Sequence, residues 1–374
     1  MSVVPEDQPP LFRVVQISKV RMNPYVRLLQ GTLRQIGIPC SLADGLSPRL
    51  VRLWREDNPV APVLPSASTE PALVLHLHWL ELLYHAPTWL RSSRLLAAVL
   101  SGLLWTKATG GRVVYTVHNL TPHERAFPRL DGLANRLLFT WADALHVHDE
   151  EARNQVGQIY GRDKGIHVIP HGSYIGAYPN ECTKQEARAQ LGLAESAFVF
   201  LFLGQIRRYK GIEDLWQAFS RLGDRTNQLV IAGNVHDVQY GQELARAVEG
   251  QKGIHLSFQY VPDAQVQYFM NACDVCVLPY RDVTTSGAAI LAFSFGKPII
   301  APALGGFVEL AAEGRGIVYN PTAPDGLLGA LHEARNTDMQ GAGQQAWAWA
   351  RQHAWPELAP RFVHLYADAL KAGN

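Results

Sequence analysis

The sequence of 374 residues has few cysteines and almost no excess of charge of either sign. Four cysteines are too few for a disulfide-built secreted scaffold, and a chain of this length can bury a core without one. Its 34 lysine and arginine residues nearly balance 33 aspartate and glutamate residues, which argues against a broad basic face for duplex nucleic acid. Any anion-binding site must therefore be local.

Several motifs of known binding and catalytic sites are also absent. The sequence contains no G-x-x-x-x-G-K-[ST] P-loop and no G-x-S-x-G nucleophile elbow. No Asp-x-Asp pair occurs, which removes the usual metal-diphosphate clamp of single-domain nucleotide-sugar enzymes. Gly341, Gly343 and Ala346 fit the spacing of a dinucleotide fingerprint, but they follow a polar helical stretch and not a strand. We therefore predict no dinucleotide site, no metal ion and no other cofactor.

Targeting signals and long apolar segments are missing too. The N-terminal MSVVPEDQPPLF lacks the basic start and the apolar centre of a signal peptide. The most lipid-like stretch, Leu95–Trp105, is shorter than the roughly 20 residues that a membrane-spanning helix needs. Arg91, Arg94 and Lys107 flank this stretch, so a contact with the membrane interface stays open beside a core helix. We predict a cytoplasmic protein, with contact at the inner face of the membrane as the open alternative.

The sequence does contain a regular alternation of strand-length apolar runs and helical segments. Continuous β-branched and aromatic runs, such as RVVYTVHN and AFVFLFLGQI, are typical of strands buried on both faces of a parallel sheet. The alternation occurs in two series, which predicts an α/β protein with two doubly wound domains. We place the domains at residues 1–171 and 172–354, followed by a C-terminal helix in 355–374.

Cysteines and histidines occur in pairs whose spacing could suit a metal ion. Cys273 and Cys276 have C-x-x-C spacing within CDVCVLP, which we interpret as a strand. Residues i and i+3 of a strand point to opposite faces, which favours buried structural thiols over metal or redox chemistry. The H-x-H pairs at 76–78 and 146–148 could bind zinc, but no third ligand of suitable spacing follows. We interpret them as histidines at sheet ends.

Positive charges follow the first strand of the second series. Arg207, Arg208 and Lys210 lie between a glycine turn and a helix. The carboxyl ends of strands line the ligand crevice of an open α/β sheet, so these cations are placed to meet an anion. On this segment alone, a solvated basic loop is an equal alternative.

A second strand-loop-helix segment, residues 273–302, favours anion binding. Thr284, Thr285 and Ser286 are hydroxyl N-cap candidates, and Gly287 lets a ligand approach the backbone amides. A helix N-terminus presents unpaired N–H groups and partial positive charge, which suit a diphosphate. One dipole contact contributes only about 0.3–1 kcal/mol and one charge-assisted hydrogen bond about 1.5–3 kcal/mol, so several donors must act together. The cations and the helix amides can do so without a metal.

Together these motifs resemble the nucleotide-sugar half of the family 4 glycosyltransferases. The matching segments are the G-x-x-R-x-x-K-G that begins at Gly204, the turn GKPIIAP and the segment GGFVEL. In the first half, TVHN matches the strand-end histidine of that family, and VIPHG matches its interdomain hinge. The resemblance covers most of the chain. It implies the GT-B fold, with two Rossmann-like domains facing a central cleft and a last helix that crosses back to the first domain.

The resemblance implies that the protein is a hexosyltransferase. It would move a sugar from a UDP-sugar or a GDP-sugar, such as GDP-mannose, to a saccharide or lipid-linked acceptor during surface polysaccharide or glycolipid synthesis. The expected reaction is retaining and independent of metal ions. Two alternatives stay open: a nucleotide-sugar epimerase of GT-B fold, and a non-catalytic subunit that binds the donor.

The resemblance also implies roles for individual residues. The catalytic candidates are His118, Arg207, Lys210 and Asp282. The donor-binding candidates are Gly204, Gln259, Tyr260, Val261, Thr284, Thr285, Ser286, Gly287 and Glu309. The acceptor-binding candidates are Tyr25, His78, Trp79, His123 and Glu124. Arg207 and Lys210 would hold the diphosphate, and Tyr260, at the end of the strand IHLSFQYV, would border the nucleobase. His118 would approach the sugar or the acceptor, although it could simply cap its strand, as Glu309 could simply stabilise a first helical turn.

One departure from the family concerns its Glu-x7-Glu pair, in which the first glutamate meets the donor sugar and the second the ribose. Counted back from Gly296, the two places fall at Val283 and Leu291, whose side chains cannot do this. Asp282 is adjacent to the first place and is the candidate substitute, whereas the helix has no acid for the second. An inverting enzyme would instead need a base, for which His118 and the segment HNLTPHE provide candidates.

Overall fold

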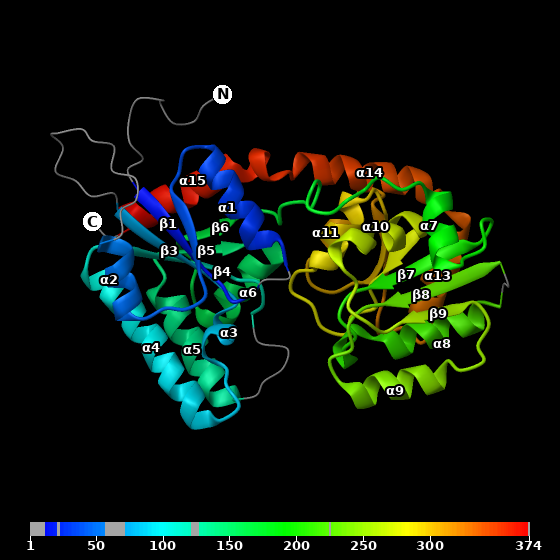
Figure 1. Ribbon diagram of the computed structural model, residues 1–374, viewed down its shortest axis with the longest axis horizontal. Coiled ribbons are helices and arrows are strands. Elements are labelled where there is room, and N and C mark those ends of the chain that lie inside the picture. The colour runs from blue at the N-terminus through cyan, green and yellow to red at the C-terminus, as the bar shows by residue number, and fades with distance from the viewer. Residues whose placement is uncertain (1–11, 21–22, 57–71, 121–126, 224–225, 373–374) are drawn as a thin grey trace. The chain divides into compact units, whose positions relative to one another are not determined.

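The computed structural model describes residues 12–20, 23–56, 72–120, 127–223 and 226–372 (Figure 1). The acceptor-binding candidates His123 and Glu124 lie outside these residues. The chain divides into two compact units, one formed by Met1–Pro170 with Trp355–Asn374 and the other by His171–Ala354. Each unit contains a six-stranded parallel sheet with helices on both faces, so the α/β architecture predicted from the sequence is confirmed.

The sheet of the first unit has the strand order β2-β1-β3-β4-β5-β6. Its strands are β1 (Phe12–Ile17), β2 (Cys40–Ala43), β3 (Ala72–His78), β4 (Arg112–Thr116), β5 (Ala144–Val147) and β6 (Ile166–Val168). Its helices are α1 (Tyr25–Gln35), α2 (Pro48–Glu56), α3 (Leu80–Tyr84), α4 (Trp89–Ala108), α5 (Pro128–Trp141), α6 (Glu150–Tyr160) and α15 (Trp355–Lys371). The strand order reverses between β1 and β3, and ligands of doubly wound sheets bind beyond the carboxyl ends of the strands at such a point.

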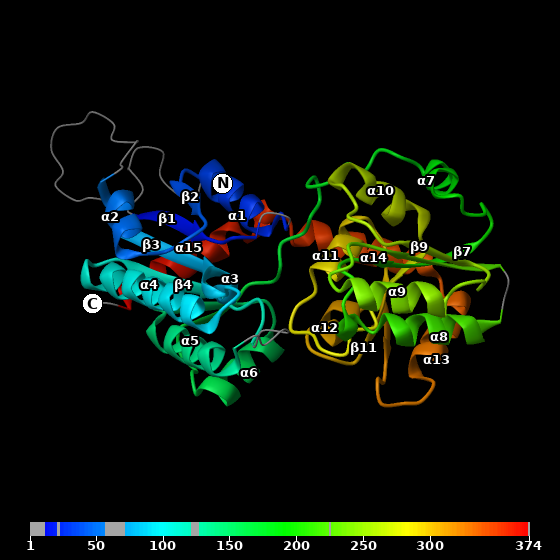
Figure 2. The ribbon, with the colours of Figure 1, turned by 60° about the horizontal axis from the view of Figure 1, so that its bottom comes forward.

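The two faces of this sheet have separate cores because side chains alternate along each strand. Val15, Leu75 and Val113 belong to the core on the side of α4 and α5. Val14 and Phe362 belong to the core on the other side, which α1 and α15 cover. Figure 2 shows α4 and α15 on opposite sides of the strands.

The sheet of the second unit has the strand order β12-β11-β10-β7-β8-β9. Its strands are β7 (Phe198–Leu203), β8 (Asn227–Ala232), β9 (Ile254–Ser257), β10 (Val275–Val277), β11 (Ile299–Pro302) and β12 (Gly316–Tyr319). Its helices are α7 (Lys184–Leu191), α8 (Ile212–Leu222), α9 (Val238–Ala247), α10 (Asp263–Ala272), α11 (Gly287–Ser294), α12 (Phe307–Ala311), α13 (Gly326–Asn336) and α14 (Met339–Gln352). This order reverses between β7 and β10, so the ends of these two strands are the expected ligand-binding position of this sheet.

Helix α4 contains Leu95–Trp105, the stretch considered for contact with the membrane. Leu96 and Leu103 on its inner side are buried. Large apolar side chains at its two ends are exposed, among them Trp89, Leu90 and Trp105. Among the described residues, none of the helices combines the length and the apolar character required to cross a membrane.

The C-x-x-C cysteines differ from the prediction in their orientation. Strand β10 begins at Val275, so Cys273 precedes it and the alternation of strand faces does not apply to the pair. The two sulfur atoms, Sγ of Cys273 and Sγ of Cys276, lie 3.9 Å apart, and both thiols are buried. The expectation of opposite faces was therefore wrong, whereas both residues are buried thiols, as interpreted.

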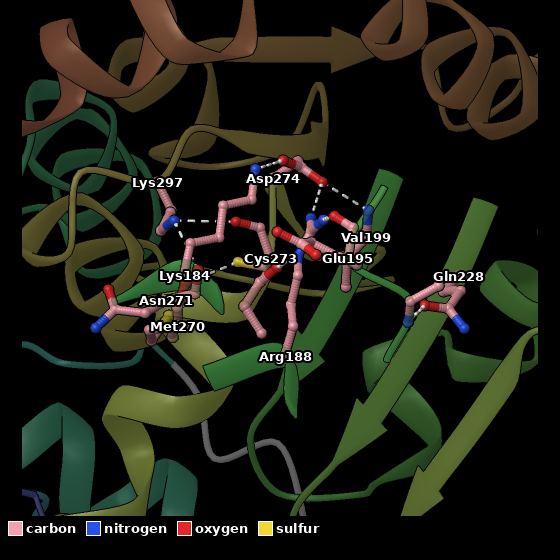
Figure 3. Close-up of polar contacts among 12 residues, drawn as sticks. Lys184, Arg188, Glu195, Val199, Gln228, Met270, Asn271, Cys273, Asp274 and Lys297 are labelled. Carbon is pink, nitrogen blue, oxygen red and sulfur yellow. Dashed lines mark hydrogen bonds and ion pairs between the residues drawn. The ribbon is translucent and has the colours of Figure 1, made fainter. Parts of the chain in front are cut away.

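A buried ion pair joins α7 to the start of β10 (Figure 3). Asp274 accepts hydrogen bonds from Arg188 at 2.9 Å and from Lys184 at 2.6 Å. It also accepts one from the backbone N–H of Val199, at the start of β7, at 2.7 Å. Only 4% of the Arg188 side chain is exposed, so most of this guanidinium is removed from water.

Replacement of Asp274 by alanine is expected to destabilise the second unit by about 3–5 kcal/mol, because it leaves the buried guanidinium of Arg188 without its carboxylate. The denaturant midpoint of this unit measures the effect. Lys184→Met is the matched control, since its side chain is 51% exposed and such a pair contributes about 1 kcal/mol at most. Equal midpoints for the two variants would contradict the prediction.

Candidate functional site

The predicted diphosphate site lies at the carboxyl ends of β7 and β10. After β7 the chain passes through Gly204 into a turn of 3-10 helix, Arg208–Lys210, which precedes α8. The Nζ atom of Lys210 lies 3.4 Å from the ring centroid of Tyr280, in the segment after β10, and 5.0 Å from that of Tyr209. These are cation–π contacts. The strand order thus brings together the two segments that the sequence analysis singled out.

Gly211 allows Lys210 to reach this position. Its φ is +65°, in the region that favours glycine. A Cβ atom on Gly211 would collide with the backbone carbonyl of Pro279, the residue before Tyr280. The Lys-Gly pair of the motif is therefore required for close packing between the turn and the end of β10.

The charge of Lys210 is only weakly stabilised by the protein. Burial, and then the positive charge of Arg207, lower the pKa of Lys210 to about 7. An anion placed at this turn would relieve both penalties. Arg208, in contrast, is exposed and donates a hydrogen bond to Glu243 at 2.9 Å. Arg207 and Lys210 thus form a cationic site that suits a phosphate group.

The loop before α11 contributes hydroxyl groups at the same edge of the sheet. Ser286 is the N-cap residue, and its Oγ accepts a hydrogen bond from the backbone N–H of Ala289 at 3.3 Å. Thr285 Oγ1 is buried and has no hydrogen-bond partner within the described part of the chain. Buried polar groups are nearly always paired in native proteins, so the Thr285 hydroxyl is a candidate ligand contact. Thr284 is half-buried in the same loop, and α11 begins at Gly287.

Helix α12 begins beside this loop. Gly305 has a φ of +49°, and a Cβ atom there would collide with the carbonyl oxygen of Val283. The backbone N–H of Gly306 donates to the carbonyl oxygen of Thr284 at 3.3 Å. Glu309, in the first turn of α12, is exposed. The structure therefore brings the helix of Glu309 to the loop that contains Thr284.

The places of the missing glutamate pair are occupied by packing residues. Val283 and Leu291 are half-buried and pack on the core of the second unit. Asp282 is exposed in the loop after Tyr280. The role of Asp282 as a replacement for the first family glutamate stays a prediction.

The candidate nucleobase contacts lie farther along the sheet. The strand expected to reach Val261 ends at Ser257, so Gln259, Tyr260 and Val261 belong to a loop. Gln259 and Tyr260 are exposed, and Val261 is half-buried. Because β8 separates β9 from β7, this loop lies two strands away from the turn of Lys210.

In the first unit, four predicted residues meet at the carboxyl ends of β3 and β4. His118 is buried just after β4, and its Nε2 lies 3.0 Å from Nδ1 of His78, the last residue of β3. The ring of Trp79 stacks on that of His118, with centroids 3.7 Å apart and an interplanar angle of 6°. Tyr25, at the start of α1, meets the His118 ring edge-on at 5.0 Å. These contacts hold the His118 ring on three sides.

The backbone of Trp79 is strained where it forms this stack. Its φ of 46° and ψ of 65° place it in the left-handed region, which a bulky residue rarely adopts. Such a conformation costs about 1–3 kcal/mol and is concentrated at active sites and ligand clamps. The stacking of Trp79 on His118 therefore supports the assignment of this sheet edge as a functional site.

A polar layer that was not predicted from the sequence lies beneath His118. Six fully buried polar residues lie on the face of the sheet that α15 covers: Gln16, His76, His78, Thr116, His146 and Tyr366. The ring nitrogens of His76 bind Tyr366 at 2.9 Å and Thr116 at 2.6 Å. The H-x-H pairs were visible in the sequence, but Tyr366 comes from α15 and no local signal connects it to them. Three of the four H-x-H histidines, His76, His78 and His146, thus belong to a hydrogen-bond network.

One group in the described part of the chain has metal-ligand geometry. Nε2 of His167 and Nε2 of His364 lie 3.7 Å and 3.2 Å from an Oδ2 of Asp368. These residues come from β6 and α15. They are separate from every residue that the sequence analysis assigned to the site.

Sequence comparison connects this geometry with a known group of enzymes. Residues 183–339 match the protein family described as Glycosyl transferases group 1. The chain is 27% identical over 300 residues to a GDP-mannose:glycolipid 4-beta-D-mannosyltransferase of Xanthomonas campestris pv. campestris. This alignment covers 79% of this chain and 80% of that protein. It is 26% identical over 282 residues to a D-inositol 3-phosphate glycosyltransferase of Xylanimonas cellulosilytica, in an alignment that covers 69% of this chain and 67% of that protein.

Solved structures share the fold at lower sequence identity. The crystal structure of Anabaena HepE in complex with UDP has a TM-score of 0.71 and 16% identity, covering 95% of this chain and 100% of that one. Sucrose-phosphate synthase of Thermosynechococcus elongatus has a TM-score of 0.73 and 17% identity, covering 96% and 100%. Two Rossmann-like units and the matched domain define this protein as a glycosyltransferase of the GT-B fold. It carries a Glycosyl transferases group 1 domain in its second unit, which confirms the resemblance to family 4 enzymes.

Proposed function

We propose that the protein transfers a hexosyl group from a nucleoside-diphosphate sugar to a hydroxyl group of a saccharide or lipid-linked acceptor. The observation that carries this proposal is the position of Lys210, which packs against Tyr280 beside Arg207 with a pKa lowered to about 7. Burial and the neighbouring charge of Arg207 disfavour the charged form of Lys210, and a departing diphosphate would offset both effects. Stabilising the leaving group at a fixed cationic site lowers the barrier to sugar transfer.

The names of similar proteins guide the choice of donor. The Xanthomonas relative is named for GDP-mannose, and HepE structures contain UDP or UDP-glucose. We propose a GDP-sugar or a UDP-sugar as donor, with GDP-mannose the first to test. Arg207 and Lys210 would contact the diphosphate, and Thr285 would contact the phosphates or the donor sugar.

The acceptor is proposed to be a glycolipid or another saccharide. The Xanthomonas relative is named for a glycolipid acceptor. Helix α4 exposes Trp89, Leu90, Leu104 and Trp105, and such side chains suit contact with the membrane interface. We therefore propose a lipid-linked acceptor reached by peripheral contact with the membrane.

We propose that the reaction needs no metal ion. The two cations at the β7 turn occupy the role that a bound divalent cation has in other nucleotide-sugar enzymes, which is to neutralise the leaving diphosphate. Activity that persists after dialysis against a chelator would support this proposal. Activity restored only by a divalent cation would overturn it.

Separate observations support retention and inversion of the anomeric configuration. The resemblance to family 4 implies retention. Two observations favour inversion: packing residues occupy the places of both family glutamates, and His118 is held rigidly at the end of β4. The Xanthomonas relative is named a 4-beta-D-mannosyltransferase, and a β-linked product from an α-linked donor means inversion. We propose inversion with His118 as the base, and the anomeric configuration of the product, read by NMR, decides between the two.

The test of the function is a transfer assay with GDP-mannose, other GDP-sugars and UDP-sugars, and lipid-linked acceptors. We expect release of nucleoside diphosphate that depends on the acceptor, together with a glycosylated product. Conversion of the donor to another nucleotide sugar without an acceptor would indicate an epimerase. Calorimetric binding of nucleotide without turnover would indicate an accessory subunit.

A further inference from the structure

We propose that a chain of hydrogen bonds through buried side chains fixes the tautomer of His118, with a hydrogen on Nε2 and a lone pair on Nδ1. The chain begins at His118 and ends at the backbone carbonyl of Ile169. It crosses β3, β1, α15, β4 and β5, which lie in the same unit (Figure 1). The inference rests on the proposed function and deepens it, because the tautomer decides whether His118 can act as a base.

Every link of the chain is a hydrogen-bond contact between buried groups. In order, the side chains are those of His118, His78, Gln16, Tyr366, His76, Thr116 and His146, followed by the carbonyl of Ile169. The seven distances are 3.0, 2.6, 3.3, 2.9, 2.6, 2.9 and 2.8 Å. The six side chains after His118 are fully buried, so water does not compete for these contacts.

The direction of the chain is set at its far end. The carbonyl oxygen of Ile169 can only accept a hydrogen bond, so Nε2 of His146 must donate. A neutral imidazole has one donor and one acceptor, so Nδ1 of His146 accepts from the hydroxyl of Thr116. The hydroxyl of Thr116 has then used its hydrogen and must accept from Nε2 of His76.

The remaining links up to His118 are fixed in the same way. With its Nε2 protonated, His76 accepts at Nδ1 from the hydroxyl of Tyr366. The Tyr366 oxygen accepts from the amide group of Gln16, which leaves the Gln16 carbonyl oxygen to accept from Nε2 of His78. Nδ1 of His78 therefore accepts, and Nε2 of His118 must donate to it. Each link permits only this direction.

These hydrogen-bond directions require neutral imidazoles, which the surroundings favour. Burial lowers the pKa of His76 and His78 well below the usual value, because a charged ring loses its hydration there. The rings also lie close together, with centroids of His76 and His78 4.3 Å apart, so a charge on one would disfavour a charge on the next. His76 and His78 are thus neutral at neutral pH, each with one donor and one acceptor nitrogen.

The tautomer has a direct chemical consequence. In the proposed step, the acceptor oxygen bonds to the anomeric carbon, and the bond from that carbon to the diphosphate oxygen breaks with its electron pair leaving on the nucleoside diphosphate. The proton of the acceptor hydroxyl passes to Nδ1 of His118 and later to water. The Nε2 hydrogen bond to His78 points the same way before and after protonation, so the chain does not reorient. With the opposite direction, Nδ1 would already carry a hydrogen and could not act as a base.

The test breaks the chain far from His118 with a nearly isosteric change. Thr116→Val keeps the shape of the side chain and removes the hydroxyl, whereas Thr116→Ser keeps the hydroxyl. Protein labelled with 15N-histidine is studied by long-range proton–nitrogen correlation NMR, and the His118 signal is assigned from its loss in His118→Gln. We expect the Nε2-protonated form in the wild type and in Thr116→Ser, and a mixture of both tautomers in Thr116→Val.

Measurements of kcat distinguish an effect on the His118 tautomer from a general effect on folding. A mixture of tautomers lowers kcat, because only the Nε2-protonated form can act as the base. An even mixture lowers kcat about twofold, and a fully wrong tautomer lowers it by up to about 10⁴-fold, as in serine proteases. Thr106→Val is the matched control, since Thr106 is also fully buried in this unit and its hydroxyl donates to the carbonyl oxygen of Gly102 within α4. We expect kcat to fall in Thr116→Val and to recover in Thr116→Ser, with Thr106→Val unchanged.

Two NMR results would overturn the inference: a hydrogen on Nδ1 of His118 in the wild type, or an unchanged tautomer in folded Thr116→Val. Both are independent of activity. If no donor sugar is turned over but the Nε2-protonated form is found and shifts in Thr116→Val, the proposed function fails while the hydrogen-bond chain stands.

Discussion

Replacement of Lys210 by methionine is expected to lower kcat by about 10²–10³-fold, the usual loss when one preorganised donor to a developing negative charge is removed. Methionine keeps most of the length and apolar contact of the lysine side chain, so the packing on Tyr280 is largely preserved. What disappears is the charge that meets the leaving diphosphate. Steady-state kinetics with the best donor measures the loss, and calorimetry with GDP or UDP measures the accompanying loss of affinity.

The neighbouring cation Arg208 provides the matched control. It lies in the same turn, but it is exposed and its guanidinium binds Glu243. Arg208→Met removes the same formal charge and is expected to change kcat by no more than a few fold, because an exposed charge is screened by water and salt. Similar losses in both variants would show that the general potential of the turn, and not the position of Lys210, stabilises the diphosphate.

The pKa of Lys210 gives this prediction a second readout. In the protein without ligand, burial and Arg207 lower the pKa of Lys210 to about 7, so a large fraction of the lysine is neutral at neutral pH. The diphosphate binds the charged form and raises this pKa, so binding takes up protons and the affinity falls as the pH rises through about 7. Lys210→Met lacks this proton uptake. Calorimetry in buffers of different ionisation enthalpy measures it, and equal uptake in the two proteins would contradict the assignment.

The part of the site that could be predicted from the sequence is the part encoded locally. The run from Gly204 to Gly211 follows a buried strand, and a chain that leaves the carboxyl end of such a strand must pass the ligand-binding edge of the sheet. Ser286 was one of three N-cap candidates, and it caps α11. Short motifs and strand ends lie within a few residues of each other, so their spacing carries the information.

The contacts that complete the site depend on strand order, which the sequence does not display. Tyr280 packs on Lys210 because β10 pairs with β7, although many residues separate them along the chain. The pairing of Tyr366 with His76 spans 290 positions and depends on the return of α15 to the first unit. Local spacing also failed for Cys273, because the start of a strand is the least certain element of a prediction.

The second large effect is expected for His118→Gln. The amide nitrogen of glutamine can take the position of the imidazole Nε2 and donate to Nδ1 of His78, so the hydrogen-bond chain stays satisfied. The amide cannot take up a proton at neutral pH, so the base is lost. General base catalysis contributes typically 10²–10⁴-fold, and we expect kcat to fall by about that factor.

Binding measurements distinguish loss of the base from loss of the fold. The cationic donor site is built within the second unit, so affinity for GDP or UDP should be retained in His118→Gln, in contrast to Lys210→Met. His364→Gln is the control for histidine replacement in the first unit, since His364 is exposed on α15 and its ring pairs with Asp368. If His118→Gln kept full kcat, neither the base nor the hydrogen-bond chain that orients it would be needed, and inversion would require another proton acceptor. If kcat fell while the affinity for GDP or UDP stayed intact, the base would be supplied by the first unit, and binding of the nucleoside diphosphate would depend on the second unit.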